Sequence, residues 1–282
     1  MSAGGVRRGP AALLGRIGRL AGRLLTPTAL ALGRVGGVSM LLARGLVHAA
    51  AAPFAGPRRL LRRQLFPMMS NVGVRSFPIV SLISFLMGAI LVLQTGEPLR
   101  KFGQIQEVPG AVALALAREI SPLMTAILMT ARVGASFTAV LGSMKINEEL
   151  LALETMGIRV LSYLVAPRFA AMLVMLPCLT TLSYLVGMVG GAAVAKAAYG
   201  IPYGLYVDKT LLYLNMTDLC SGLVKAAIFS LLITSICCYF GLETEGGSVG
   251  LGRNIMVAVV TSLVAIIAAD ALATGVINNY IL

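Results

Sequence analysis

Five long apolar stretches dominate this sequence, and they restrict the chain to a fold in which helices cross a membrane. The first, 77–95, has no charged side chain, and the others are expected at about 111–141, 160–195, 219–240 and 255–277. About twenty apolar residues are needed to cross the hydrocarbon layer as a helix, where every backbone amide must bond within its own segment. We therefore predict an all-α integral membrane protein with about five spans; a sixth span or a re-entrant first segment also fits the pattern.

The positive charge of the chain is concentrated before the first span. Lys and Arg number 23 against 11 Asp and Glu, and twelve arginines from Arg7 to Arg75 occur with no acid among them. Arginines spaced among leucines are typical of a helix at the membrane surface rather than of a nucleic-acid site. We expect 1–75 to be a basic interfacial segment that the positive-inside rule keeps in the cytoplasm, followed by a transmembrane domain at 76–282.

A short acidic segment, 142–159, lies between the second and third predicted spans. Asn147 is the expected N-cap, and Gly157 can end a helix in the left-handed conformation. Glu148 and Glu149 then occupy the first turn, where negative charge suits the helix dipole. The segment is too short and too charged to cross a bilayer. It is expected to lie in the cytoplasm, either as a helix of about three turns that contacts another protein or as a simple connection between spans.

Ionisable side chains inside the predicted spans are the next constraint, because each costs on the order of 3 kcal/mol at bilayer depth. Under the five-span topology, four of them share one depth toward the outer side, and Lys225 with Asp270 is one expected pair. They are either buried ion pairs that orient helices or parts of a ligand site. The fifth, Arg132, lies alone nearer the cytoplasm and is expected to snorkel or to cap carbonyl groups. The five residues are Arg118, Glu119, Arg132, Lys225 and Asp270.

Two glycines of the third predicted span, Gly187 and Gly191, form a small-xxx-small pair. Such a pair lets a second helix approach the backbone closely. We expect this helix to come from the same chain rather than from a second copy.

No catalytic or nucleotide-binding motif accompanies these features. The sequence contains no GxxxxGK[ST] phosphate loop, no HExxH and no GxSxG motif, and its four cysteines lack metal-ligand spacing. We therefore expect no enzyme activity, no metal site and no cofactor, so that ATP would have to be bound by a partner subunit. Such a chain fits a channel, a secondary carrier or the permease half of a pump, and the acidic cytoplasmic helix favours the pump.

About residues 60–280 resemble the MlaE (YrbE) permeases of ABC transporters, which move phospholipids or other lipids across Gram-negative and related envelopes. The resemblance implies a homodimer in the bacterial inner membrane, bound to ABC ATPase subunits and to an MCE-domain (MlaD-like) protein on the periplasmic face. The matching stretches are LRRQLFPMMSNVGVRSFPIV, GAILVLQT, AREISPLMTAILMTARVGASFTAVLGSMKINEELLALETMGI, APRFAAMLVMLP, GLVKAAIFSLLI and AAD at 268–270.

The resemblance also implies roles for individual residues. The family's lipid cavity lies between two permease copies near the outer leaflet. Leu91 and Leu99 are expected to contact acyl chains there, next to Glu119, and Arg118 is expected to bind either a phosphate or Glu119. The family's coupling helix falls on 144–157. Its expected ATPase contacts are Glu148, Glu149, Glu154, Met156 and Gly157.

The leading hypothesis is therefore a lipid-transport permease driven by a separate ATPase. One alternative is a secondary carrier that uses Asp270 and Lys225 for proton or ion coupling. Another is a scaffold that anchors the MCE-domain protein in the membrane and transports nothing.

Overall fold

The computed structural model describes residues 36–43 and 58–280, and this part of the chain consists of helices and short connections without any strand. A short helix covers 36–43. The remaining α-helices are α2 (Arg58–Val72), α3 (Phe77–Lys101), α4 (Val108–Ala115), α5 (Ser121–Met129), α6 (Ala135–Ile146), α7 (Glu149–Thr155), α8 (Ala166–Tyr199), α9 (Tyr203–Tyr213), α10 (Met216–Leu242) and α11 (Gly247–Tyr280). The all-α prediction is confirmed.

Five helical stretches in the described residues are long and apolar enough to cross a membrane. They are Leu65–Lys101, Ile105–Ile146, Leu161–Tyr199, Met216–Leu242 and Gly247–Ile277. This agrees with the five predicted spans, but the first begins well before 77. The end of α2 leads through the 3₁₀ turn Val74–Ser76 into α3, so the helical stretch starts inside the segment predicted to lie on the membrane surface. Most of that basic segment, 1–35 and 44–57, lies outside the described residues.

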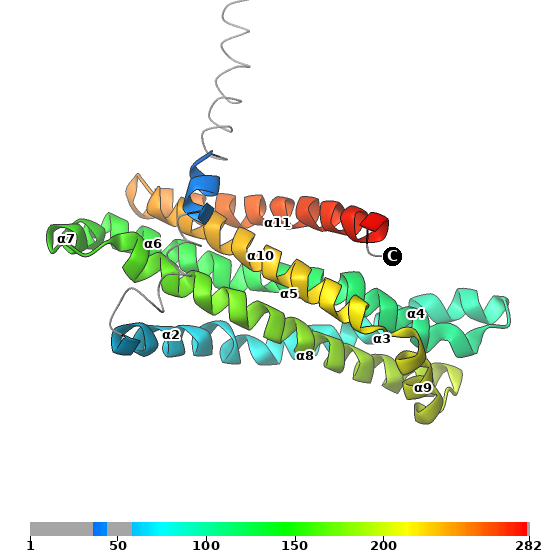
Figure 1. The fold of residues 1–282 in the computed structure, drawn as a ribbon. Helices are drawn as coiled ribbons and strands as arrows, with labels where there is room; N and C mark the ends of the chain where they lie inside the picture. Colours follow the sequence, from blue (N-terminus) through cyan, green and yellow to red (C-terminus); the bar gives the residue numbers. More distant parts are fainter. Residues whose placement is uncertain (1–35, 44–57, 281–282) are drawn as a thin grey trace, which may run out of the picture.

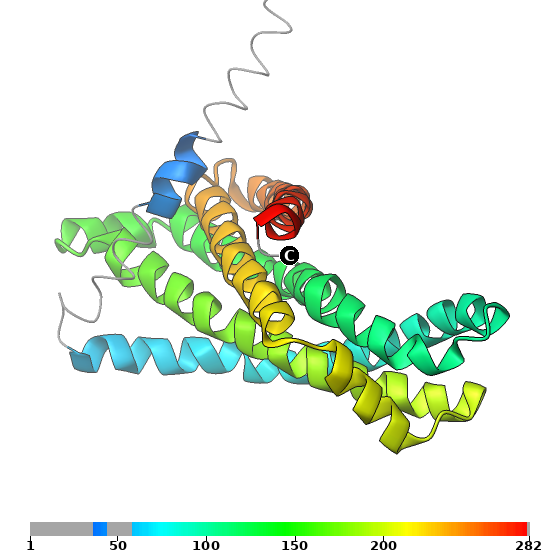
Figure 2. The same cartoon turned by 45° about the vertical axis from the view of Figure 1, so that its right-hand side comes forward.

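The long helices lie side by side along one common direction, as Figures 1 and 2 show. The short helix α7 lies at one end of this bundle, and α4 and α9 lie at the opposite end. Since the two ends of a membrane-spanning helix face opposite sides, α7 and α9 belong to opposite sides of the membrane. This arrangement separates any surface around α7 from any surface around α9.

Helices α3 and α8 approach so closely that their contact requires glycine. A Cβ atom on Gly88 would lie 1.9 Å from the carbonyl oxygen of Gly187, and one on Gly190 would lie 2.2 Å from that of Phe85. A Cβ atom on Gly191 would lie 3.2 Å from the side chain of Val92 in α3 and 2.5 Å from the hydroxyl of Tyr206. The prediction that Gly187 and Gly191 serve packing within one chain is therefore confirmed.

The helices differ in how far the chain itself covers them. In the most apolar window of each span, 61% of the residues are buried in α10 but only 17% in α11 and 28% in the span that contains α3. Helix α10 is therefore central, and α3 and α11 present broad apolar faces to their surroundings. Bilayer lipid or another protein surface can cover such faces.

Candidate functional site

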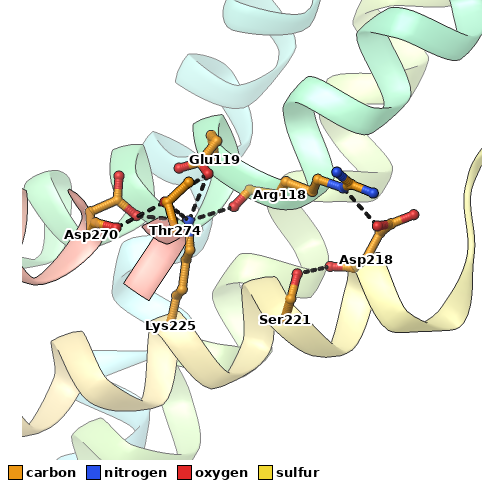
Figure 3. A network of polar contacts seen from close by, with 7 residues as sticks. All are labelled: Arg118, Glu119, Asp218, Ser221, Lys225, Asp270 and Thr274. Atoms are coloured by element: carbon orange, nitrogen blue, oxygen red, sulfur yellow. Dashed lines mark hydrogen bonds and ion pairs between the residues drawn. The ribbon is translucent and has the colours of Figure 1, made fainter. Parts of the chain in front are cut away.

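Lys225 of α10 is the centre of a polar cluster inside the bundle, drawn in Figure 3. Its Nζ atom lies 2.8 Å from Oε1 of Glu119 and 3.0 Å from Oδ1 of Asp270. Nζ also donates to Oγ1 of Thr274 at 2.7 Å and to the carbonyl oxygen of Arg118 at 3.2 Å. The side chain is only 2% exposed. The expected pair of Lys225 with Asp270 is confirmed, and Glu119 adds a second carboxylate.

Thr274 of α11 completes the cluster. Its Oγ1 lies 2.9 Å from Oε1 of Glu119 and 2.9 Å from the carbonyl oxygen of Asp270, one turn before it, so the single hydroxyl proton is shared between these two acceptors. Thr274 was not among the predicted site residues. Its position four residues after Asp270, on the same helix face, was the available signal.

Arg118 pairs with Asp218, a residue that directly precedes the predicted span 219–240. The Nε atom of Arg118 donates to Oδ1 of Asp218 at 2.7 Å, and the carboxylate is only 2% exposed. Asp218 stands in the first turn of α10, where its Oδ2 accepts the backbone N–H of Asn215 in a capping box. Arg118 therefore does not pair with Glu119, one of its two expected partners. The Asn-x-x-Asp spacing of a capping box was the sequence signal for Asp218.

The local backbone explains how these side chains come together. Arg118 and Glu119 lie in a π-helical turn, Leu116–Ile120, a rare feature that is frequent at functional sites. Pro122 follows, and it has no N–H to offer to the carbonyl group of Arg118 four residues earlier. Lys225 donates to that carbonyl instead.

Helix α10 reaches this π turn because it carries glycine at the point of contact. A Cβ atom on Gly222 would lie 2.3 Å from the carbonyl oxygen of Ala117 and 2.2 Å from the hydroxyl of Tyr184. The close approach brings Lys225, one turn further along α10, within reach of Glu119.

The cluster is divided into buried and accessible groups. Lys225, Asp218 and Asp270 have side chains that are 2%, 2% and 14% exposed. Those of Arg118 and Glu119 are 33% and 37% exposed. The cluster contains three carboxylates and two cations. Its buried members hold the cation of Arg118 and the carboxylate of Glu119 at the surface of the cluster. A ligand can reach the outer guanidinium nitrogens of Arg118, because only its Nε is used by Asp218.

Leu91 and Leu99 of α3 lie half-buried in an apolar cluster with buried residues from α3, α4, α8 and α9. The same cluster contains Leu116, the first residue of the π turn. Apolar and charged groups therefore adjoin at this turn, although no polar contact links either leucine to the ion pairs.

The acidic segment between the second and third spans is not one continuous helix, which corrects its predicted start. Helix α6 continues to Ile146, and the N–H of Asn147 still bonds to Ser143 inside that helix. Asn147 therefore ends α6 instead of capping α7. Glu148 adopts the left-handed conformation, with φ +59°, and α7 begins at Glu149. The helix is interrupted at this point because a left-handed residue breaks the helical path.

The five residues expected to contact an ATPase all lie on the exposed surface around α7: Glu148, Glu149, Glu154, Met156 and Gly157. Met156 is 66% exposed, and the φ of +74° at Gly157 agrees with the predicted helix end. A cleft of about 490 Å³ separates α7 from the bundle and includes Glu148 and Glu154 in its lining. The surface therefore offers carboxylates and an apolar side chain to a partner.

Two further arginines lie in the half of the bundle nearer α7. Arg132 donates from Nη1 to the hydroxyl of Ser76. Capping of backbone carbonyls was one of its two expected roles, and among the described residues its hydrogen bond goes to this side chain instead. Arg168 of α8 is 3% exposed, donates to the carbonyl of Leu164, and lies over the ring of Phe137 at 5.6 Å. Arg168 was not among the predicted site residues, although a charged residue within the predicted span 160–195 was a usable signal.

Comparison with known proteins gives one consistent result. The family described as Permease MlaE matches residues 65–276. A probable ABC transporter permease protein of Synechocystis sp. is 35% identical over 208 residues, which cover 74% of this chain and 79% of that protein. One of Rickettsia typhi is 34% identical over 215 residues, covering 76% and 81%. The chloroplastic protein TRIGALACTOSYLDIACYLGLYCEROL 1 of Arabidopsis thaliana is 33% identical over 208 residues, covering 74% and 59%.

Proposed function

This chain belongs to the MlaE family of ABC transporter permeases, and we propose that it moves phospholipid or a related lipid between the inner membrane and a periplasmic MCE-domain partner, driven by a separate ATPase. The observation that carries this proposal is the placement of two surfaces on one bundle. The accessible side chains of Arg118 and Glu119, called the charged pair below, adjoin an apolar cluster toward the α4 and α9 end. The exposed acidic helix α7 lies at the other end.

The charged pair suits a phospholipid head group. The guanidinium of Arg118 can donate two parallel hydrogen bonds to a phosphate while Asp218 holds its Nε. Glu119 can accept from a hydroxyl or ammonium group of the same head group. Acyl chains would then lie along Leu91 and Leu99, in the apolar cluster that meets the π turn at Leu116. A phospholipid needs this combination of a polar and an apolar site.

Helix α7 suits the transmission of movement from an ATPase. Glu148, Glu149 and Glu154 present carboxylates that can pair with basic side chains in a groove of that subunit. Met156 adds an adaptable apolar contact. Because α6 runs into α7 with only two residues between them, a displacement of α7 acts directly on the span that carries Arg118 and Glu119. ATP itself is assigned to the partner subunit.

A second copy of the chain is the proposed occupant of the sparsely covered apolar faces. Only 17% of the most apolar window of α11 is buried within one chain. A homodimer would cover part of this surface and enclose the charged pair together with the apolar cluster. The cavity for lipid would then lie between the two copies.

The MCE-domain partner is assigned to the end that carries α9. Lys209 of α9 pairs with Glu107 at 2.5 Å, which fixes α9 beside the start of the second span. Leu211, Leu212 and Met216 are 69%, 70% and 78% exposed around the end of this helix. Such an exposed apolar surface at this end of the bundle can bind a protein or lie on the membrane surface.

Reconstitution tests the proposal. The permease, its ATPase and its MCE-domain partner are placed in proteoliposomes, and transfer of a fluorescent phospholipid is followed with and without ATP. We expect ATP-dependent transfer that Arg118→Gln reduces and that Arg100→Gln, an exposed residue at the end of α3, leaves unchanged. Transfer that responds to a pH gradient and not to ATP would select the carrier that uses Lys225 and Asp270. No transfer by an assembled complex would select the scaffold.

A further inference from the structure

A second cleft lies in the half of the bundle nearer α7, away from the Lys225 cluster. It has a volume of about 300 Å³ and lies between the last turn of α2, the π turn Thr130–Gly134 with the start of α6, and the first turn of α8. Its polar lining consists of Asn71, Arg132, Ser136 and Arg168. Its apolar lining consists of Met68, Val72, Val133, Phe137 and Val140.

The two arginines in this cleft have no acidic partner. All 11 acidic residues of the chain lie in the described part, and none has a carboxylate oxygen within 4.0 Å of Arg132 or Arg168. The remaining contacts are with uncharged groups, namely the Ser76 hydroxyl, the Leu164 carbonyl and the Phe137 ring. The other intramembrane cations, Arg118 and Lys225, each have a carboxylate partner. The cleft therefore carries two uncompensated positive charges.

Arg168 is buried and has a hydrogen-bond donor without a partner in the described part of the chain. Its side chain is among the buried ones, with the residue only 3% exposed, and its Nε has no hydrogen-bond partner among the described residues. A buried guanidinium with an unused donor costs free energy unless an acceptor binds to it. Arg168, which lines the cleft, therefore has donor capacity that the described part of the protein leaves unused.

The depth of the cleft selects the kind of anion. The stretch Ile105–Ile146 has 42 residues, so it is about 63 Å long at about 1.5 Å per residue, about twice the hydrocarbon thickness of about 30 Å. When the midpoint of this stretch is put at the bilayer centre, Arg132 lies about 10 Å from the centre, on the α7 side. When the midpoint of Leu161–Tyr199 is put there, Arg168 lies about 18 Å from the centre on the same side. The boundary of the hydrocarbon layer, about 15 Å from the centre, falls between them.

We propose that this cleft binds the phosphate group of a phospholipid from the leaflet on the α7 side. Arg132 and Arg168 hold the phosphate as two cationic donors, and Asn71 and Ser136 at the exposed rim add neutral hydrogen bonds. Val133, Val140 and Phe137 contact the glycerol and the first part of the acyl chains. The site is separate from the accessible pair at Arg118 and Glu119. It does not depend on transport, and it would bind lipid equally in a non-transporting scaffold.

Native mass spectrometry of the full-length permease, delipidated in detergent and then titrated with single lipids, tests this assignment. The probes are a phosphatidylglycerol, the diacylglycerol with the same acyl chains, and inorganic phosphate as a competitor. We expect phosphatidylglycerol to bind and diacylglycerol not to bind. Arg132→Gln should lower the affinity about tenfold, as expected for the loss of a charge-assisted hydrogen bond.

Three further variants keep the test decisive. Arg168→Lys retains the buried charge but loses the fork of donors, and it should also weaken binding. Ser136→Phe, on the exposed rim one helical turn after Arg132, fills the cleft with an aromatic ring while both arginines are retained, and it should remove the phosphatidylglycerol bound there. Arg253→Gln, an exposed arginine at the start of α11, should have no effect.

Two results would overturn the assignment. Equal binding of phosphatidylglycerol by the wild type, Arg132→Gln and Ser136→Phe would show that the lipid binds elsewhere. Full displacement of phosphatidylglycerol by millimolar inorganic phosphate would show a site for a soluble anion instead. Lipid transfer in proteoliposomes is a separate measurement, so a failed transport proposal and a failed binding site give different results.

Discussion

Lys225 of α10 and Asp270 of α11 form an ion pair with 3.0 Å between Nζ and Oδ1, and the two side chains are 2% and 14% exposed. The same Nζ lies 2.8 Å from a carboxylate oxygen of Glu119 in the second span. One ammonium group therefore connects three of the five spans. This connection fixes the rotation of the three helices about their axes and orients Arg118 and Glu119 toward any ligand.

Lys225→Met is expected to destabilise the protein by roughly 3–5 kcal/mol, because it leaves two carboxylates near each other without their cation. The measurement is the free energy of unfolding in mixed micelles with increasing denaturant. The double variant Lys225→Met/Asp270→Leu should recover part of this loss, since one orphaned charge is removed. Unchanged stability of the single variant would contradict a structural role for the ion pair.

Asp218→Asn is expected to reduce lipid transfer severalfold while the protein stays folded. Asparagine retains an acceptor for the capping box of α10 but removes the charge that holds Nε of Arg118. The measurement is ATP-dependent transfer in proteoliposomes, with circular dichroism as the check on folding. Asp208→Asn, in α9, is the matched control. Equal transfer by both variants would separate Asp218 from the lipid site.

Gly88→Ala is expected to lower stability by about 1–3 kcal/mol, because the new methyl group would overlap the carbonyl oxygen of Gly187 and force α3 and α8 apart. Gly204→Ala is the control, since no atom lies within 4 Å of the added Cβ atom in α9. Alanine also favours a helix over glycine, so the control should be neutral or slightly stabilising. The midpoint of thermal unfolding in detergent distinguishes the two variants.

Reversing the charge on α7 should separate the permease from its ATPase. Glu148→Lys and Glu154→Lys, together, are expected to abolish co-purification of the two proteins, because carboxylates that face basic side chains are replaced by cations. Glu97→Lys, an exposed change in α3, should leave co-purification intact. A stable complex in the double variant would exclude α7 as the acidic contact.

Glu148 permits a second test of the same surface. Its left-handed backbone is tolerated by asparagine but disfavoured for β-branched residues. Glu148→Asn should therefore keep the fold and weaken the ATPase contact only modestly, whereas Glu148→Val should also strain the backbone at the break between α6 and α7. Thermal stability of the permease alone measures the strain. Equal stability of the two variants would contradict it.

The fold class and the number of spans could be predicted from the amino-acid sequence alone. Apolar runs of bilayer length are a local property, because each segment must satisfy its own backbone hydrogen bonds. The pairing of Lys225 with Asp270 was also predictable, since opposite charges at equal depth in a membrane usually form ion pairs. The family match extends over 65–276 and agrees with the resemblance found in the motifs.

Tertiary structure decided which side chains meet. The pairing of Arg118 with Asp218 depends on the π turn, on the missing N–H of Pro122 and on the close approach allowed at Gly222. The break between α6 and α7 depends on one left-handed residue, Glu148, which carries no sequence signal of its own. Hydropathy fixes that a helix crosses the membrane, but its rotation and distance from its neighbours come from packing between segments far apart in the chain.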